Sequence, residues 1–148
     1  MVTYDTLIDT TQEQVSSILK ANSTVKTITS KVLPGTPYTS IQSKIGFPYI
    51  KVETPTLETT KKCFGGVENV SVTCPIRCYN TKASRGRELA DAVRKAIKAA
   101  RGTTITVELD DNKLPNTEHS EALLQDSKTI LYTDSVIITY LFWGEIDD

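Results

Sequence analysis

The segment from Ser135 to Trp143 constrains the fold more than any other part of the sequence, because its apolar side chains alternate onto both faces of an extended chain. One face would hold Val136, Ile138, Tyr140 and Phe142, and the other face would hold Ile137, Leu141 and Trp143. A strand that is covered on both sides lies in the middle of a sheet or at a contact between subunits. The segment therefore predicts a sheet protein with this strand in one of those two places.

A second strand is predicted where apolar and polar residues alternate from Val70 to Cys78. Its apolar face would consist of Val70, Val72, Cys74, Ile76 and Cys78. Pro75 falls on the polar face and removes one backbone donor, so we expect this strand to lie at an edge of the sheet or to be bulged there.

Shorter strands are predicted by the same alternation and by turn residues. They cover Phe47–Glu53, Thr103–Leu109, Ala122–Gln125 and Thr129–Tyr132, the last two joined by a turn at 126–128. Residues 54–66, which end in a glycine pair, and the acidic residues 110–121 are predicted to be connections.

Two helices are predicted by apolar residues that recur every three to four positions. The first runs from about Thr3 to Ala21, and the second from about Ser84 to Arg101, with Gly102 as its stop. The side of the second helix that would face a sheet is formed by Leu89, Ala92, Val93, Ala96, Ile97 and Ala100. The element order predicts an α+β fold, in which two helices pack on a mainly antiparallel sheet, in one domain spanning 1–148.

Charge is unevenly distributed along a chain whose net charge is −1. Residues 1–81 carry a balance of +2, residues 82–101 of +5 and residues 102–148 of −8. The basic side chains Arg87, Arg94, Lys98 and Arg101 would lie opposite the apolar face of the second helix. They could form a solvated face, contact the acidic third of a neighbouring copy, or neutralise phosphates of a nucleic acid. A pI near 5.9 and the lack of aromatic residues on this helix argue against nucleic acid.

The residues that could support metal binding or catalysis are poorly placed for either. In an extended strand, the Cα atoms of Cys74 and Cys78 would lie roughly 13 Å apart, too far for one ion unless Pro75 bends the chain. Cys63 is distant from both, and the one histidine, His119, lies in the acidic connection, which we expect to be mobile. We therefore expect Cys74 and Cys78 to be buried thiols, and the protein to have no metal site, no cofactor and no enzymatic activity.

The N-terminal residues lack a basic segment followed by an apolar one, and no apolar run is long enough to cross a membrane. An odd number of cysteines in such a chain indicates reduced thiols. We expect the protein to be made in a cytoplasm, and to stay there or be packaged from it.

The order and spacing of these elements resemble the tail-terminator (tail-completion) proteins of siphovirus-like tailed viruses. The resemblance is carried by the aromatic-proline entry into the strand at Phe47–Val52, by VENVSVTCPIRCYN, and by the helix in SRGRELADAVRKAI. A strand, an extended β arm and a long C-terminal strand then close the domain. These motifs are a pattern of elements without a catalytic signature, so no site residue is transferred from the family.

The resemblance implies a non-enzymatic virion protein of the tail or neck, assembled in the host cytoplasm. It implies a ring, expected to be a hexamer, that caps the head-proximal end of the tail tube and joins it to the head connector. The implied partners are copies of the chain, the tail-tube protein, and the head connector or a head-completion protein. DNA would pass through the pore without specific binding, and no membrane is involved.

Two alternatives to a tail terminator stay open at this point. The chain could be another neck or tail component, such as a head-completion protein or a tail-tube subunit. It could instead be a cytoplasmic nucleic-acid-binding module that uses the basic helix at 84–101. In the assembly interpretation, the opposite charges orient copies head to tail, and the subunit interface is expected to include Arg87, Arg94, Lys98, Arg101 and Trp143.

Overall fold

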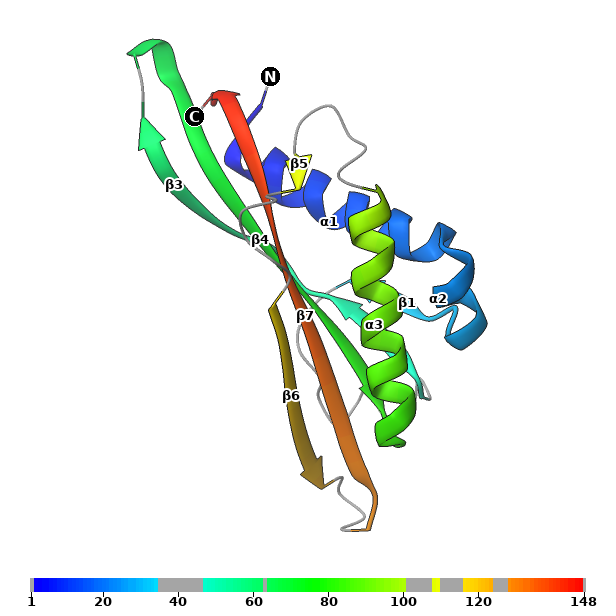
Figure 1. Cartoon of the computed structure of the whole chain (residues 1–148). Helices are drawn as coiled ribbons and strands as arrows, with labels where there is room; N and C mark the ends of the chain where they lie inside the picture. Colours follow the sequence, from blue (N-terminus) through cyan, green and yellow to red (C-terminus); the bar gives the residue numbers. More distant parts are fainter. Residues whose placement is uncertain are drawn as a thin grey trace.

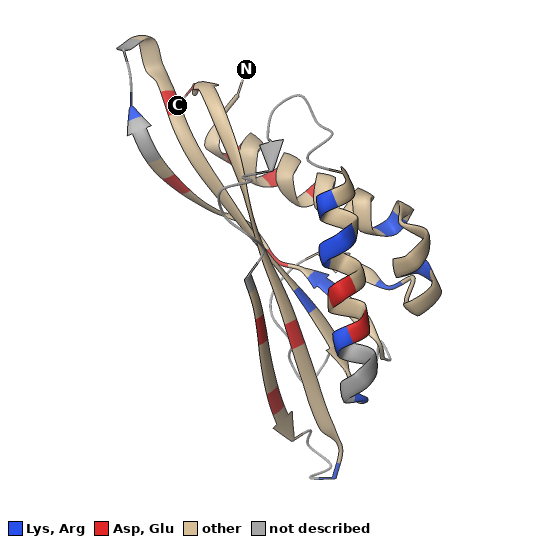
Figure 2. Cartoon of the chain, in the orientation of Figure 1, with Lys and Arg blue, Asp and Glu red and all other residues tan. Residues whose placement is uncertain are grey.

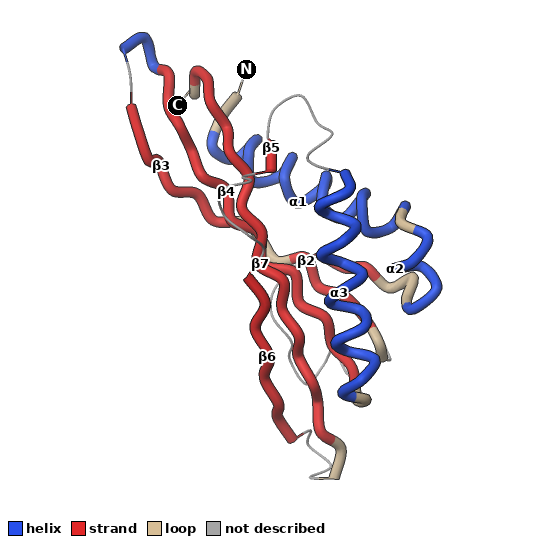
Figure 3. The backbone as a smooth tube through the Cα atoms, in the orientation of Figure 1, coloured by secondary structure: helices blue, strands red, loops and turns tan. Residues whose placement is uncertain are grey.

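The chain forms one sheet with its helices packed on one face (Figures 1 and 3). The computed structural model describes residues 2–34, 47–62, 64–100, 108–109, 116–123 and 128–147. Within these residues the sheet has seven strands, and every strand pair is antiparallel except one. The predicted α+β class with a mainly antiparallel sheet is therefore confirmed.

A long antiparallel ribbon of two strands forms the axis of the sheet. Strand β4 (Val67–Asn80) pairs along its whole length with strand β7 (Ile130–Glu145). The strands predicted at 129–132 and 135–143 are thus parts of one continuous strand. β7 has partners on both of its edges, so the central position predicted for the C-terminal segment is confirmed.

The two ends of the ribbon carry different neighbours. At one end the order is β1 (Val32–Pro34), β2 (Tyr49–Val52), β4, β7 and β6 (Asn116–Leu123), where β1 and β2 form the parallel pair. At the other end the order is β3 (Thr56–Lys62), β4, β7 and β5 (Glu108–Leu109). Strands β3 and β6 therefore lie at opposite ends and on opposite edges, and the β6–β7 hairpin lies where the family resemblance implies an extended β arm (Figure 1).

Between these two ends lies a waist in which, among the described residues, only β4 and β7 are paired. On β4, pairing with β3 ends at Thr73 and pairing with β2 begins at Ile76. On the outer edge of β7, the residues between Ile137 and Tyr140 pair with neither β5 nor β6. The predicted edge position is wrong, because Pro75 pairs with Ile137 in the uninterrupted central ladder. The predicted irregularity is present on the other side of β4, where the register shifts by one residue between the β2 and β3 ladders. The carbonyl of Pro75 accepts from the Glu53 amide at 3.0 Å, on the side where β2 gives way to β3. The donor that proline lacks therefore falls at a break in the neighbouring ladder.

Two predicted connections are in fact strands. Residues 54–66 include β3, followed by a turn in which Gly65 and Gly66 have φ angles of 79° and 78°, a backbone conformation that glycine adopts without steric cost. Residues 110–121 include most of β6, whose described side chains are all exposed. An exposed edge strand has no buried face, so its sequence shows no apolar alternation. The predicted segments 103–107 and 124–125 lie outside the described residues.

Three α-helices cover the sheet where two were predicted. Helix α1 (Tyr4–Ala21) begins at Thr3, whose side chain accepts from the amide of Thr6. Asn22 ends α1 and also starts the extra helix α2 (Ser23–Ile28), because its side chain accepts from the Val25 amide at 3.0 Å. Helix α3 (Ala83–Ala100) follows β4 directly. No helix in these described ranges combines the length and apolar character needed to cross a bilayer.

The main core lies between the helices and one face of the ribbon. Its β4 contribution is the predicted alternating set, with Val70, Val72, Cys74, Ile76 and Cys78 all fully buried. The predicted apolar face of α3 packs against it through Leu89, Ala92, Val93, Ala96 and Ile97, while Ala100 is only half-buried. A smaller cluster of Tyr49, Tyr79 and Leu131 is buried on the other face of the sheet.

The face of α3 can be tested by truncating one buried and one exposed side chain. Leu89→Ala removes a fully buried side chain and should lower the free energy of unfolding by about 2–5 kcal/mol. Lys98→Ala, on the exposed side of the same helix, should change it by less than about 0.5 kcal/mol. Urea unfolding followed by circular dichroism measures both, and equal effects would contradict this packing.

Candidate functional site

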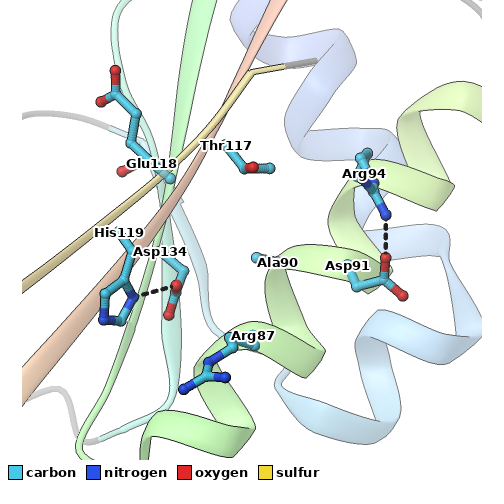
Figure 4. Close-up of a pocket in the computed structure, with 9 residues that line it drawn as sticks. Arg87, Ala90, Asp91, Arg94, Thr117, Glu118, His119 and Asp134 are labelled. Atoms are coloured by element: carbon cyan, nitrogen blue, oxygen red, sulfur yellow. Dashed lines mark hydrogen bonds and ion pairs between the residues drawn. The ribbon is translucent and has the colours of Figure 1, made fainter. Parts of the chain in front are cut away.

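A hollow of about 420 Å³ lies between α3 and the β6–β7 hairpin (Figure 4). Cross-strand partners of a sheet point to the same face, and this places His119 of β6 and Asp134 of β7 together on the side of α3. The full lining comprises Arg87, Ala90, Asp91 and Arg94 from α3, Thr117, Glu118 and His119 from β6, and Asp134 and Ser135 from β7.

His119 joins the two strands of the hairpin on this face. Its Nδ1 lies 2.6 Å from Oδ1 of Asp134, and its Nε2 lies 3.1 Å from Oε1 of Glu121. The hydrogen bond to Asp134, and then that to Glu121, raise the pKa of His119 above its ordinary value. The imidazolium form can donate to both carboxylates and so holds the edge strand β6 on β7. The prediction that His119 lies in a mobile connection is wrong, because the polar sequence around it belongs to this strand.

Asp134 is the most deeply buried charged group of the hollow, with only 6% of its surface exposed. Its second oxygen, Oδ2, has no hydrogen-bond partner among the described residues, so His119 is its principal polar contact. Asp134 stands directly opposite Cys78 in the ladder. A carboxylate in this position depends on its histidine partner, because an unpaired buried charge is costly.

The basic side chains of α3 are partly engaged within the helix. The Asp91 carboxylate lies 2.5 Å from Nη2 of Arg94 and 2.9 Å from Nζ of Lys95. The hydrogen bond from Lys95, and then that from Arg94, hold the pKa of Asp91 below its ordinary value. Arg87 and Lys98 are exposed. Of the four basic residues predicted at a subunit interface, Arg87 and Arg94 line the hollow and Lys98 does not. Arg101 lies outside the described residues.

Figure 2 shows that the basic helix α3 and the acidic residues of the β6–β7 hairpin lie side by side in one chain. The sequence separates them into a +5 and a −8 segment, and the fold brings parts of both to the same hollow. The sequence alone does not predict this juxtaposition, because the polar residues of β6 show no strand pattern. A contact between these charges in different copies stays a prediction.

Trp143, the other residue expected at a subunit interface, lies far from the hollow. Its side chain is 58% exposed, whereas the preceding Phe142 is buried in the core, so Trp143 projects from the face of β7 opposite the helices. Leu123 and Ile130 are also exposed, at 65% and 38%, and they pair with each other near the far end of β7. Large apolar side chains are thus exposed near both ends of the ribbon.

The two described cysteines are buried thiols, as predicted. Cys74 and Cys78 lie in the main core. Burial, and then the charge of Glu53, raise the pKa of Cys74 to about 12, and burial, and then the charge of Asp134, also raise the pKa of Cys78. Within the described part of the chain, no three histidine, cysteine, aspartate or glutamate residues are grouped to hold a metal ion. Cys63 lies outside that part.

The His119 contacts predict a pH-dependent contribution to stability. Because folding raises the pKa of His119, this contribution is fully present below the unfolded-state value of about 6.5 and is lost as pH rises through the higher folded-state value. The His119 side chain is 39% exposed, so the expected loss in His119→Gln is about 1 kcal/mol or less. Urea unfolding at pH 6 and pH 9 should show the larger deficit at pH 6. An equal deficit at both values would contradict the ion pair, and Lys95→Gln serves as a control for an exposed charge.

Comparisons with known proteins identify the fold but no family. No protein-family profile matches the chain, and no curated protein matches it by sequence. Among solved structures, 19 chains match. One is a chain from the structure described as "Virion of native gene transfer agent (GTA) particle", which is 11% identical with a TM-score of 0.63. The match covers 90% of this chain and 94% of that one, so the two share essentially the whole fold.

Proposed function

We propose that the chain is a virion structural protein that forms a ring on the head-proximal end of a tail tube and joins the tube to the head connector. The observation that carries the proposal is the shared fold with a chain of a gene transfer agent virion, over 90% of this chain and 94% of the other. The tail-terminator role is the one that the element order of the sequence resembles. The proposed partners are copies of the chain, the tail-tube protein, and the head connector or a head-completion protein.

The described surface supports a protein that works by assembly. Trp143 at one end of the ribbon, and Leu123 with Ile130 at the other, expose large apolar side chains of the kind found at protein contacts. Residues 130 and 143 are separated by roughly 40 Å of extended strand, so the two apolar sites can serve different partners. The ring, its expected six subunits and its place in the tail or neck are part of the proposal.

The described residues give little support to an enzymatic function or to nucleic-acid binding. His119 is engaged by two carboxylates and the thiols of Cys74 and Cys78 are buried, so none of these groups is set up as a base with a nearby nucleophile. On α3, Arg94 and Lys95 already pair with Asp91, which reduces the positive charge available to phosphates. We therefore propose a non-enzymatic role in which DNA passes through the ring without specific binding.

The proposal predicts that the protein binds tail-tube ends as an oligomer. When it is mixed with tubes assembled from the tail-tube protein of the same particle, electron microscopy should show added density at one end of each tube. The mass of the bound protein should correspond to a ring, expected to be a hexamer. Incorporation along the tube wall would favour a tail-tube subunit, and binding to isolated heads alone would favour a head-completion protein. If it stays monomeric and leaves tubes unbound, the assembly proposal fails.

A matched pair of variants tests whether Trp143 contributes to this assembly. Trp143→Ala should weaken ring formation or tube binding by about 1 kcal/mol or more, roughly fivefold, because exposed tryptophans are frequent anchors of interfaces. Lys20→Ala, which changes an exposed residue of α1, should have no measurable effect. Equal behaviour of the two variants would remove Trp143 from the interface.

A further inference from the structure

The fully exposed charges on the face of the sheet opposite the helices are all acidic in the described part of the chain. The ladder registers place three such side chains on this face, and they are Glu58 of β3, Glu118 of β6 and Glu145 of β7. The basic residues of the same face are largely withdrawn from solvent, because Lys51 is 7% exposed and half-buried Arg77 is paired with Glu53. Figure 4 shows the Glu118 side chain pointing away from the hollow on the helix side.

Trp143 lies on this face and is flanked by carboxylates. Trp143 and Glu145 are two residues apart on β7, so their side chains point the same way. Glu58 lies in one row with Ser71 and the half-buried Leu141, the residue that precedes Trp143 on this face. Trp143 and the three exposed glutamates are named the acidic face. It suits a partner that brings positively charged side chains with long aliphatic stems, because these pack on an indole ring and pair with carboxylates.

Helix α3 carries side chains of this kind on the side that faces away from the core. Its outward residues recur at helical spacing, and they are Arg87, Asp91, Arg94, Lys95 and Lys98. The side chain of Lys95 is 73% exposed and that of Arg94 is 41% exposed, although both also contact Asp91. These five residues, named the basic stripe, therefore keep a net positive charge that can meet carboxylates of another molecule.

The other long helix on the same side of the sheet does not fit the acidic face. The exposed residues of α1 include three acidic ones, Asp5, Asp9 and Glu13, with Lys20 in its last turn. Packing α1 on the acidic face would place carboxylates against carboxylates, and like charges across an interface oppose association. The basic stripe is thus the surface of the two long helices whose charge complements the acidic face.

The two complementary surfaces lie on opposite sides of the sheet, since α3 covers one side and Trp143 projects from the other. Two copies in the same orientation can therefore stack so that the basic stripe of one meets the acidic face of the next. Each copy still offers one surface of each kind to a further neighbour, and a head-to-tail contact of this type can close into a ring. Contacts of either surface with its own kind would bring like charges together.

The lengths of the two surfaces also agree. Helix α3 has 18 residues and is roughly 27 Å long, and β7 from Ser135, opposite Glu118, to Glu145 is roughly 33 Å long. Helix α3 runs alongside the ribbon with its last turn, which holds Lys98, toward the end that carries β5 and Trp143 (Figure 1). In copies stacked in the same orientation, Lys98 is therefore the residue of the basic stripe that lies nearest to Glu145 of the neighbour.

We propose that copies of this chain associate by packing the basic stripe of α3 in one copy on the acidic face of the next, with Lys98 near Glu145. The inference rests on the proposed function and deepens it, because it names the two surfaces that build the ring. Trp143 supplies apolar burial at this contact, and the opposite charges orient it.

Cross-linking of engineered cysteines tests the contact directly. In a full-length Cys63→Ser background, Lys98→Cys and Glu145→Cys are purified separately, mixed, and treated with a short bifunctional maleimide, which the buried thiols of the core should not reach. The mixture should yield a covalent dimer several times faster than either variant alone. Lys62→Cys takes the place of Glu145→Cys in the matched control, because Lys62 is exposed at the same end of the ribbon but on the helix-covered face. Absence of the mixed dimer, or an equal rate in the control, overturns the contact.

Charge reversal provides a second readout that does not depend on thiols. Lys98→Glu and Glu145→Lys should each raise the dissociation constant for self-association about fivefold, measured by sedimentation. An equal mixture of the two variants should assemble almost as tightly as the unaltered protein, because each altered surface then meets its reversed counterpart. Failure of the mixture to recover would overturn the pairing of Lys98 with Glu145.

The outcomes also separate this contact from the proposed function. If the Lys98–Glu145 cross-link is absent but the protein still caps tail tubes, the ring uses other surfaces and the proposed function stands. If the cross-link forms but tube ends stay unbound, the contact between copies stands and the proposed function fails.

Discussion

The antiparallel ladder between β4 and β7 is the interaction on which the rest of the molecule depends. Every other strand except β1 is attached to one of these two, and β1 is attached through β2. The same ladder aligns the apolar residues of both strands on one face, and α1 and α3 bury that face. Each strand of the ribbon uses one edge to pair with the other strand. Its second edge can therefore pair with shorter strands at both ends of the ribbon.

The core of this fold can be predicted from the sequence because its buried apolar residues recur with the period of a strand or of a helix. Val70 to Cys78 alternate, and Leu89, Val93 and Ile97 recur at helical spacing, and both sets are buried as the patterns indicate. The sequence does not predict the short helix α2, because Asn22 both ends one helix and caps the next. A proline inside a strand usually marks an edge, whereas Pro75 lies in a central strand and faces the gap between β2 and β3.

The candidate site was less predictable because its parts are brought together by a strand with no apolar signature. The polar sequence from Asn116 to Glu121 is typical of a connection, and only the ladder with β7 places His119 against Asp134. The basic character of α3 was evident from the sequence, but its proximity to acidic residues of the same chain was not. Charges that are far apart in the sequence can therefore lie close together in the fold. Some of the opposite charges that were expected to meet between copies already lie near each other within one chain.

The waist at Cys74 and Pro75 has a mechanical consequence. Two-stranded ribbons twist more strongly than wide sheets, and the described ladder is reduced to two strands between the β2–β6 end and the β3–β5 end. The helices brace this region on one face, where Cys74 and Ile138 are buried. Torsion about the ribbon axis is therefore concentrated at the waist, and a small rotation there changes the angle between the β3 and β6 edges without breaking either ladder. In the proposed ring, such a joint would let the same sequence fit different curvatures.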